Sequence, residues 1–151
     1  MTFPDNASPL IDSLWMGGHP PLGPGLAKHS FDALVLAAKE FQPNEQSFPD
    51  IEVLHAPMDD DFKGMPVGDR ERAVNAARQT ARWVKQGKNV LVTCWQGRNR
   101  SGVIAALALM LLRPKAKPEQ VVHLIRSARG PLALSNPHFT RLLLDAAKKK
   151  S

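Results

Sequence analysis

Apolar residues in this chain occur in two patterns, short uninterrupted runs and longer stretches with helical spacing. Uninterrupted apolar runs bounded by turn residues are typical of strands that are buried on both faces. Four runs rich in apolar residues predict strands, at 14–16, 31–37, 51–58 and 89–93, and the run 31–37 is consistent with a buried strand. We interpret 14–16 as the first strand, because Gly17 and Gly18 follow it as a turn.

Helical spacing of apolar residues predicts four helices. In the stretch 69–86, Ala73, Ala77 and Ala81 recur on one face, and Gly87 follows as a stop signal. The remaining predicted helices are 101–112, 118–129 and 137–149. The segments 20–25 and 43–49 are predicted loops because they are rich in Pro, Gly and polar residues.

The order of these elements predicts an α/β fold with a mostly parallel central sheet flanked by helices. Strands that alternate with helices, and that are apolar throughout, indicate a sheet covered on both faces. The length of 151 residues suits one domain with its own core, and no internal repeat is visible. We therefore predict a single domain over 1–151, with its core at about 10–146.

The only cysteine of the sequence follows the last predicted strand, at Cys94. Ligands of such sheets bind at the carboxyl ends of strands, and amides at a helix N-terminus bind anions and favour an ionised thiol. Arg100 adds a planar guanidinium that can grip two phosphate oxygens. This turn, which also contains Gly97, predicts a phosphate site with a nucleophilic sulfur; the alternative is a buried, inert cysteine.

Composition limits the cellular compartment and the classes of binding partner that we expect. A single cysteine cannot form an intramolecular disulfide, which favours a reducing, cytoplasmic environment. The first six residues lack a signal-peptide pattern, and the longest apolar stretch, 103–112, is too short to span a bilayer. The net charge of +6 suits anionic partners such as phosphorylated proteins, inositol phospholipids or RNA. No set of His, Cys and carboxylate residues has metal-ligand spacing, so we predict no metal and no cofactor. The oligomeric state cannot be predicted from the sequence.

The stretch 94–102, Cys-Trp-Gln-Gly-Arg-Asn-Arg-Ser-Gly, resembles the phosphate-binding loop of the cysteine-dependent protein tyrosine phosphatase superfamily. The short chain looks most like its dual-specificity phosphatase branch. Further similarity lies in the segments 14–18, 56–60, 128–130 and 136–139. The resemblance extends over about 10–146 and implies a phosphatase of the dual-specificity type.

The resemblance also implies a role for each position of the loop. Cys94 would attack phosphorus as a thiolate and form a cysteinyl-phosphate. Ser101 would hydrogen-bond the sulfur and ease its departure in the second step. The phosphate-binding residues would be those of the loop that follows the cysteine: Trp95, Gln96, Gly97, Arg98, Asn99 and Arg100.

A leaving oxygen needs a proton, so a carboxylic acid must stand near the loop. In the family this aspartate follows a proline by three residues, and Pro57 therefore implies Asp60. Asp59 and Asp61 flank it, and a shift of one residue would transfer the role to either. We predict Asp60 as the general acid.

One position departs from the family pattern. Thr93 occupies the place where the family usually has a histidine that orients the loop. We expect a reduced catalytic efficiency rather than a different site.

Three kinds of function follow from these residues. A phosphatase for phosphotyrosine and phosphoserine or phosphothreonine in proteins is the main prediction. A basic residue at the position of Arg98 resembles the loop of inositol-lipid phosphatases. The Gly-x-Asn-Arg pattern resembles the loop of RNA 5′-triphosphatases of the superfamily. A phosphate-binding module without turnover, or sulfur transfer by a rhodanese-like domain, are the alternatives from other classes.

Overall fold

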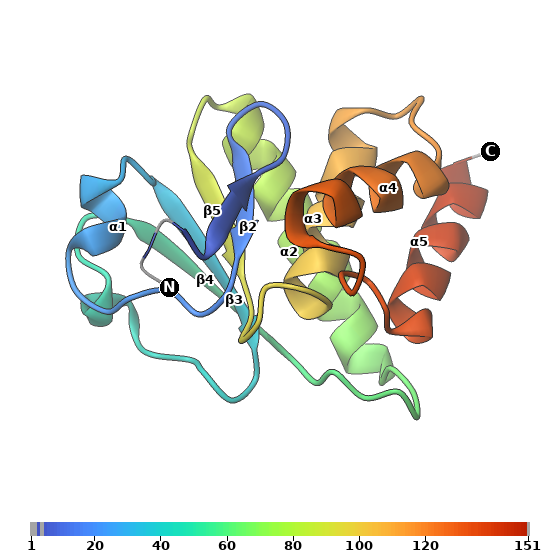
Figure 1. Ribbon diagram of the computed structural model, residues 1–151, viewed down its shortest axis with the longest axis horizontal. Coiled ribbons are helices and arrows are strands. Elements are labelled where there is room, and N and C mark those ends of the chain that lie inside the picture. The colour runs from blue at the N-terminus through green and yellow to red at the C-terminus, as the bar shows by residue number, and fades with distance from the viewer. Residues whose placement is uncertain (1–2, 4, 151) are drawn as a thin grey trace.

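The computed structural model describes residue 3 and residues 5–150 (Figure 1). The outermost residues of the predicted domain, 1–2 and 151, and residue 4 of the segment judged for a signal peptide, lie outside the described residues. The elements in chain order are β1 (Ala7–Pro9), β2 (Leu14–Gly17), α1 (Gly25–Lys28), β3 (Ala33–Ala38), a 3₁₀ turn η1 (Glu45–Ser47), β4 (Glu52–Met58), α2 (Val67–Lys85), β5 (Val90–Thr93), α3 (Arg100–Leu112), α4 (Pro118–Arg129) and α5 (Pro137–Lys150).

The strands form one sheet in the order β1-β2-β5-β3-β4. Strands β2, β5, β3 and β4 are parallel, which confirms the mostly parallel sheet that the sequence predicts. The sheet is nevertheless mixed, because β1 pairs antiparallel with β2 at one edge. The sequence analysis missed β1 and counted β2 as the first strand; a three-residue edge strand ending in Pro9 has no readable periodicity.

Helices cover both faces of the sheet, as the apolar strands predict. Along β3, Leu34 and Leu36 pack into a small core with Leu26 of α1. Their neighbours Val35 and Ala37 face a larger core formed with α2, α3, α4 and α5. Figure 1 shows α1 on one side of the sheet and the four longer helices on the other.

The boundaries differ from the prediction at a few places. The last residue of the predicted loop 20–25 begins the one-turn helix α1, and the predicted connector 43–49 contains η1. Helix α3 begins at Arg100, one residue earlier than predicted, and is buried over almost its whole length. It starts directly after the turn that follows β5, so this turn lies at the carboxyl edge of the sheet. None of the described helices has the length and apolar character to cross a bilayer.

Candidate active site

The candidate site is the turn between β5 and α3. Strand β5 lies between β2 and β3, so neighbouring strands flank the turn on both sides. Cys94 is only 4% exposed, and its Sγ lies 3.2 Å from the hydroxyl of the fully buried Ser101. The structure therefore brings together the sulfur and the hydroxyl that the sequence pairs.

The carbonyl oxygens of the turn all accept hydrogen bonds from outside it. Arg129 donates from Nη2 to the carbonyl of Gln96 at 3.2 Å and from Nε to that of Gly97 at 3.0 Å. Backbone amides donate the other three bonds. The amide of His19 donates to the carbonyl of Trp95 at 3.2 Å, that of Leu134 to the carbonyl of Arg98 at 3.2 Å, and that of Val103 to the carbonyl of Asn99 at 2.9 Å.

These bonds fix the direction of the amides. In a trans peptide the N–H of one residue points opposite to the C=O of the residue before it. Because the carbonyls of 95–99 are held outside the turn, the amides of 96–100 point to the opposite side, toward its centre. A ring of N–H donors at a helix N-terminus is a site for an anion.

The segment after α4 braces the turn. Leu134 is buried at a positive φ of 56°, a conformation that a branched side chain rarely adopts. Arg126 holds it there by donating to the carbonyls of Ala133 and Leu134 at 2.9 and 3.0 Å. Arg129, which also braces the turn, has a lowered pKa because it is buried. The charge at Cys94 opposes this decrease in the pKa, and the charge of Arg98 increases it.

Gly97 is the position in the turn that requires a glycine. Its φ is +69°, and a Cβ there would lie 2.5 Å from the carbonyl carbon of Gly17 and 2.6 Å from the amide of Gly18. These two atoms are backbone at the end of β2 and cannot move aside cheaply, whereas Nη2 of Arg129, which would also clash, is the far end of a flexible side chain. The absence of a side chain lets the turn pack directly on the neighbouring strand.

We expect Gly97→Ala to destabilise the protein by about 1–3 kcal/mol beyond the cost of the backbone conformation alone, because the methyl group must displace β2. Chemical denaturation measures this. Gly87→Ala is the matched control, since Gly87 has a similar φ of +84° and no atom of the described residues lies within 4 Å of the place that its methyl group would take. Equal losses of stability in the two variants would contradict the steric explanation.

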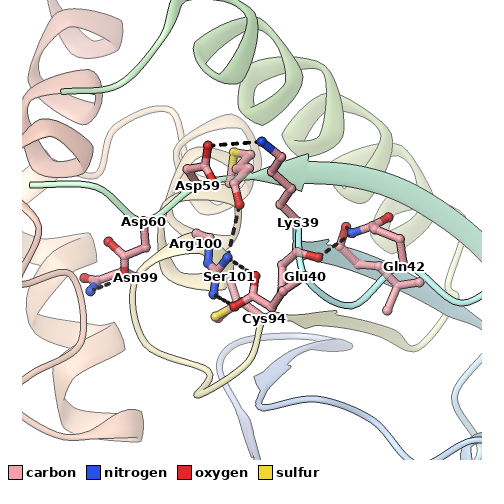
Figure 2. Close-up of polar contacts among 12 residues, drawn as sticks. Lys39, Glu40, Gln42, Asp59, Asp60, Cys94, Asn99, Arg100 and Ser101 are labelled. Carbon is pink, nitrogen blue, oxygen red and sulfur yellow. Dashed lines mark hydrogen bonds and ion pairs between the residues drawn. The ribbon is translucent and has the colours of Figure 1, made fainter. Parts of the chain in front are cut away.

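The guanidinium of Arg100, which is 8% exposed, is held by a residue that the sequence analysis missed. Glu40, just after β3, accepts two hydrogen bonds, from Nη1 at 2.5 Å and from Nη2 at 2.8 Å. The carbonyl of Met58 accepts a third from Nη1 at 3.1 Å. Figure 2 shows Glu40 reaching toward Arg100, with the Cys94 sulfur beside Ser101.

The charges of this pair support each other. The hydrogen bonds from Arg100 lower the pKa of Glu40 from its ordinary value of 4.5, although burial opposes the change. Burial alone would lower the pKa of Arg100, but the bonds to Glu40 and the charges at Cys94, Glu40 and Asp60 raise it overall. The ion pair therefore persists at neutral pH and is lost only as the pH falls through the lowered pKa of Glu40, below 4.5.

One edge of the guanidinium has no hydrogen-bond partner in the described part of the chain. Three of its five N–H donors are used by Glu40 and Met58, all from the two terminal nitrogens. Nε is buried and has no partner among the described residues. The Nε–H and the adjacent Nη2–H form a side-on fork, which is the geometry that grips two oxygens of one phosphate.

Asp60 lines the same pocket of about 240 Å³ as Cys94 and Arg100. Its two carboxylate oxygens accept hydrogen bonds from the side-chain amides of Asn99 at 3.0 Å and Asn136 at 2.8 Å. Asn136 is completely buried, and its backbone amide donates to the Asn99 side chain at 3.1 Å. Two linked amides thus fix the carboxylate beside the turn.

The neighbouring acids have other contacts. The carboxylate of Asp59 lies 3.5 Å from Nζ of Lys39, and that of Asp61 accepts a bond from the amide of Lys63 at 2.8 Å. Asp59 lines the adjoining hollow rather than the pocket of Cys94. The geometry favours Asp60, whose role as general acid stays a prediction.

The rim of the pocket is aromatic on one side. Trp95, 44% exposed, stacks on His19 with ring centroids 4.2 Å apart, and Phe41 meets both rings edge-on at 6.0 Å. Arg98 is exposed at the same rim. Thr93 does not contact the sulfur, because its hydroxyl donates to the carbonyl of Val35 at 2.8 Å.

Three bracing residues had no predicted role: Glu40, Arg129 and Asn136. Arg129 and Asn136 belong to segments that carry the resemblance, which gave the only signal for them in the sequence. Glu40 had none, because a single acid after a strand is most often a solvated residue. Among the described residues, no cluster of three or more His, Cys, Asp or Glu could hold a metal ion.

Known proteins resemble the chain along most of its length. The family model of the dual specificity phosphatase catalytic domain matches residues 14–149. No curated protein sequence matches the chain.

Solved structures resemble its fold. A mouse putative dual specificity phosphatase complexed with zinc tungstate is 22% identical, with 99% of this chain and 91% of that chain covered and a TM-score of 0.83. Human DUSP28 is 24% identical, with coverages of 97% and 95% and a TM-score of 0.80. The active form of Tk-PTP is 22% identical, with coverages of 98% and 99% and a TM-score of 0.80.

At these identities the solved structures establish the shared fold, and the family match establishes the kinship. The match covers most of the 151 residues and includes both the β5–α3 turn and the segments that brace it. The chain therefore belongs to the dual specificity phosphatase family and is a cysteine-dependent phosphatase.

Proposed function

We propose that this domain hydrolyses phosphate monoesters of phosphotyrosine and phosphoserine or phosphothreonine in proteins, with Cys94 as the nucleophile. The observation that carries the proposal is the grouping of Cys94, Asp60 and Arg100 around one pocket, with an edge of the Arg100 guanidinium that has no partner among the described residues. Two parallel donors beside a sulfur, below a ring of amides, match a phosphate whose phosphorus faces the sulfur.

In the first step the Cys94 thiolate attacks phosphorus, and the P–S bond forms as the bond to the leaving oxygen breaks. Asp60, protonated, transfers its proton to the leaving oxygen. Arg100 and the amides of 96–100 hold the three other oxygens as their charge rearranges. Substrate alcohol or phenol leaves, and cysteinyl-phosphate remains.

In the second step a water molecule attacks the phosphorus of the cysteinyl-phosphate. Asp60, now a carboxylate, takes the proton of the water, and the P–S bond breaks to return the thiolate and release inorganic phosphate. The Ser101 hydroxyl, 3.2 Å from the sulfur, donates a hydrogen bond to the departing thiolate. Asp60 is protonated again at the end of the cycle, so the reaction balances.

Protein substrates are favoured by the shape of the opening. The pocket of Cys94 continues into a hollow of about 540 Å³ over Lys39, Asp59 and Asp60. A wide opening admits side chains of different lengths together with the peptide that carries them. Trp95 on the rim supplies a flat surface for the ring of a phosphotyrosine.

A second candidate is an inositol phospholipid, and the position of Arg98 favours it. Its guanidinium is exposed at the rim of the pocket, where a second phosphate of the substrate would lie. A solved structure with the same fold, PTPMT1 in complex with PI(5)P, is 13% identical with a TM-score of 0.76. An RNA 5′-polyphosphate would likewise place its second phosphate beside Arg98.

We expect Asp60→Asn to lower kcat by about 100- to 10,000-fold for alkyl phosphates, whose poor leaving groups need the proton. Aryl phosphates with good leaving groups should lose much less. Steady-state kinetics with the two substrate classes measure the difference. Asp61→Asn is the matched control, because the Asp61 carboxylate accepts a hydrogen bond from the amide of Lys63 in its own loop. A large loss there with normal activity in Asp60→Asn would move the assignment by one residue.

A substrate panel tests the proposed specificity. Phosphopeptides, phosphoinositides and triphosphate-ended RNA are compared by phosphate release, with Cys94→Ser as the blank. The proposal expects the highest kcat/KM for phosphopeptides. A preference for phosphoinositides that disappears in Arg98→Ala would support the second candidate, and binding without release for every substrate would support a module without turnover.

A further inference from the structure

A second pocket, of about 210 Å³, lies away from the catalytic turn between α2, α3 and α5. Helices α2 and α5 both pack against α3, the helix that Figure 1 shows next to them. Residues of all three helices line the pocket. It shares no lining residue with the pocket of Cys94. Nothing in the proposed reaction uses it.

The floor of this second pocket is apolar. Leu107 and Met110 of α3 and Leu142 of α5 form its base and are almost completely buried. Ala77 and Ala146 line the walls, and their short side chains leave space that a larger residue would fill. A dry cavity of comparable size, about 150 Å³ in an engineered protein, binds benzene, so this volume is large enough for a hydrocarbon chain.

The rim of the second pocket is cationic. Arg70, Arg78 and Lys149 line it together with a single acid, Asp145, which gives a net charge of +2. Asp145 is occupied, since Arg70 lies 3.2 Å and Arg141 lies 3.4 Å from its carboxylate. Arg78 and Lys149 have no ion-pair partner among the residues that the structure describes.

The three cations lie together at one opening. A wider hollow of about 470 Å³ continues from the pocket and is lined by the same Arg70, Arg78 and Lys149, together with one acid, Glu71. An elongated ligand that enters from this side would leave its head beside the cations and place its tail over α3. Complementary chemistry is therefore an aliphatic chain that ends in one anionic group.

We propose that this second pocket binds a medium-chain fatty acid, with the carboxylate at Arg78 and Lys149 and the chain on Leu107, Met110 and Leu142. The volume of about 210 Å³ exceeds the roughly 150 Å³ of the cavity that binds benzene, which suits an aliphatic chain of medium length. A protein partner fits less well, because a stable interface uses about 20–30 residues on each side, whereas 11 residues line the pocket.

Isothermal titration of the whole protein with decanoate tests the proposal, and decyltrimethylammonium supplies the same tail with the opposite charge. We expect one decanoate per chain and no binding of the ammonium. The double variant Arg78→Glu/Lys149→Glu should weaken decanoate binding by about tenfold or more. Arg82→Glu/Lys85→Glu, which reverses two exposed charges of α2 outside the pocket, should bind normally.

Filling the pocket tests the tail. Ala146→Leu should abolish binding, whereas Ala147→Leu adds the same atoms on the same helix outside the pocket and should not. If Ala146→Leu fails to fold, as judged by circular dichroism, the charge variants decide alone. Equal binding of the ammonium, normal binding in the Arg78→Glu/Lys149→Glu variant, or a dimer in sedimentation that this variant dissociates would overturn the proposal.

Discussion

Replacement of Cys94 with serine is expected to reduce phosphate release to background, a loss on the order of 10⁶-fold like that of other enzymes without their nucleophile. A serine hydroxyl is not ionised near neutral pH and cannot attack phosphorus at a useful rate. Its oxygen would still lie beside Ser101, so the turn should keep its shape. Single-turnover kinetics with an aryl phosphate measure the loss.

The same variant separates catalysis from binding. Because the amides of 96–100 and the Arg100 fork remain, Cys94→Ser should still bind inorganic phosphate or a phosphopeptide in calorimetry. Residual turnover near the normal rate would exclude Cys94 as the nucleophile. Loss of both turnover and thermal stability would instead indicate that the cysteine is a packing residue.

The second large effect is expected for Arg100→Lys, with kcat/KM lower by roughly 1,000-fold. Arg100 must satisfy Glu40 and Met58 with one set of donors and keep a second edge for the substrate. A lysine ammonium has three donors and no planar fork. It would satisfy the buried acceptors and leave too few donors for the phosphate.

Arg98→Lys is the matched control for this variant, since Arg98 belongs to the same turn and has an exposed side chain that donates to Gln96 at 3.4 Å. We expect its kcat/KM for an aryl phosphate to change by less than about threefold. Similar losses in the two variants would mean that charge alone matters. Normal activity in Arg100→Lys would refute the proposed phosphate fork.

The parallel sheet and the grouping of Cys94 with Arg100 in one turn could be predicted because each depends on residues that are close together in the chain. Cys94, Arg100 and Ser101 share one turn, and the apolar runs that frame it are long enough to be recognised. The short elements α1 and β1 were missed because three or four residues cannot show a period. Local pattern therefore explains why the parallel sheet was predicted and the short elements were not.

The bracing of the site could not be predicted in the same way. Glu40 lies 60 residues from Arg100, Arg129 lies 32 residues from Gly97, and Asn136 lies 76 residues from Asp60. Each contact forms only when the sheet and the α4–α5 segment have packed. The resemblance marked two of these residues, but no pattern in the sequence gives their partners.

Asp60 is an intermediate case. The family spacing of three residues after a proline selected Asp60 from three consecutive acids. A shift of one residue would still have assigned the general acid to Asp59 or Asp61. The structure distinguishes the three carboxylates by their partners: buried amides for Asp60, a lysine for Asp59 and the backbone of its own loop for Asp61. A buried amide such as Asn136 is a costly group to leave unpaired, which ties the position of Asp60 to the start of α5.

The outside anchoring of the turn has a consequence for protein engineering. Transplanting the octapeptide 94–101 onto another strand-to-helix junction would carry the sulfur and the guanidinium but not the clamps on its peptide planes. Those clamps come from His19, from Arg129 and from Leu134, whose left-handed backbone depends in turn on Arg126. The smallest unit that can be transplanted is thus discontinuous, and a graft must include His19 and the stretch 126–136.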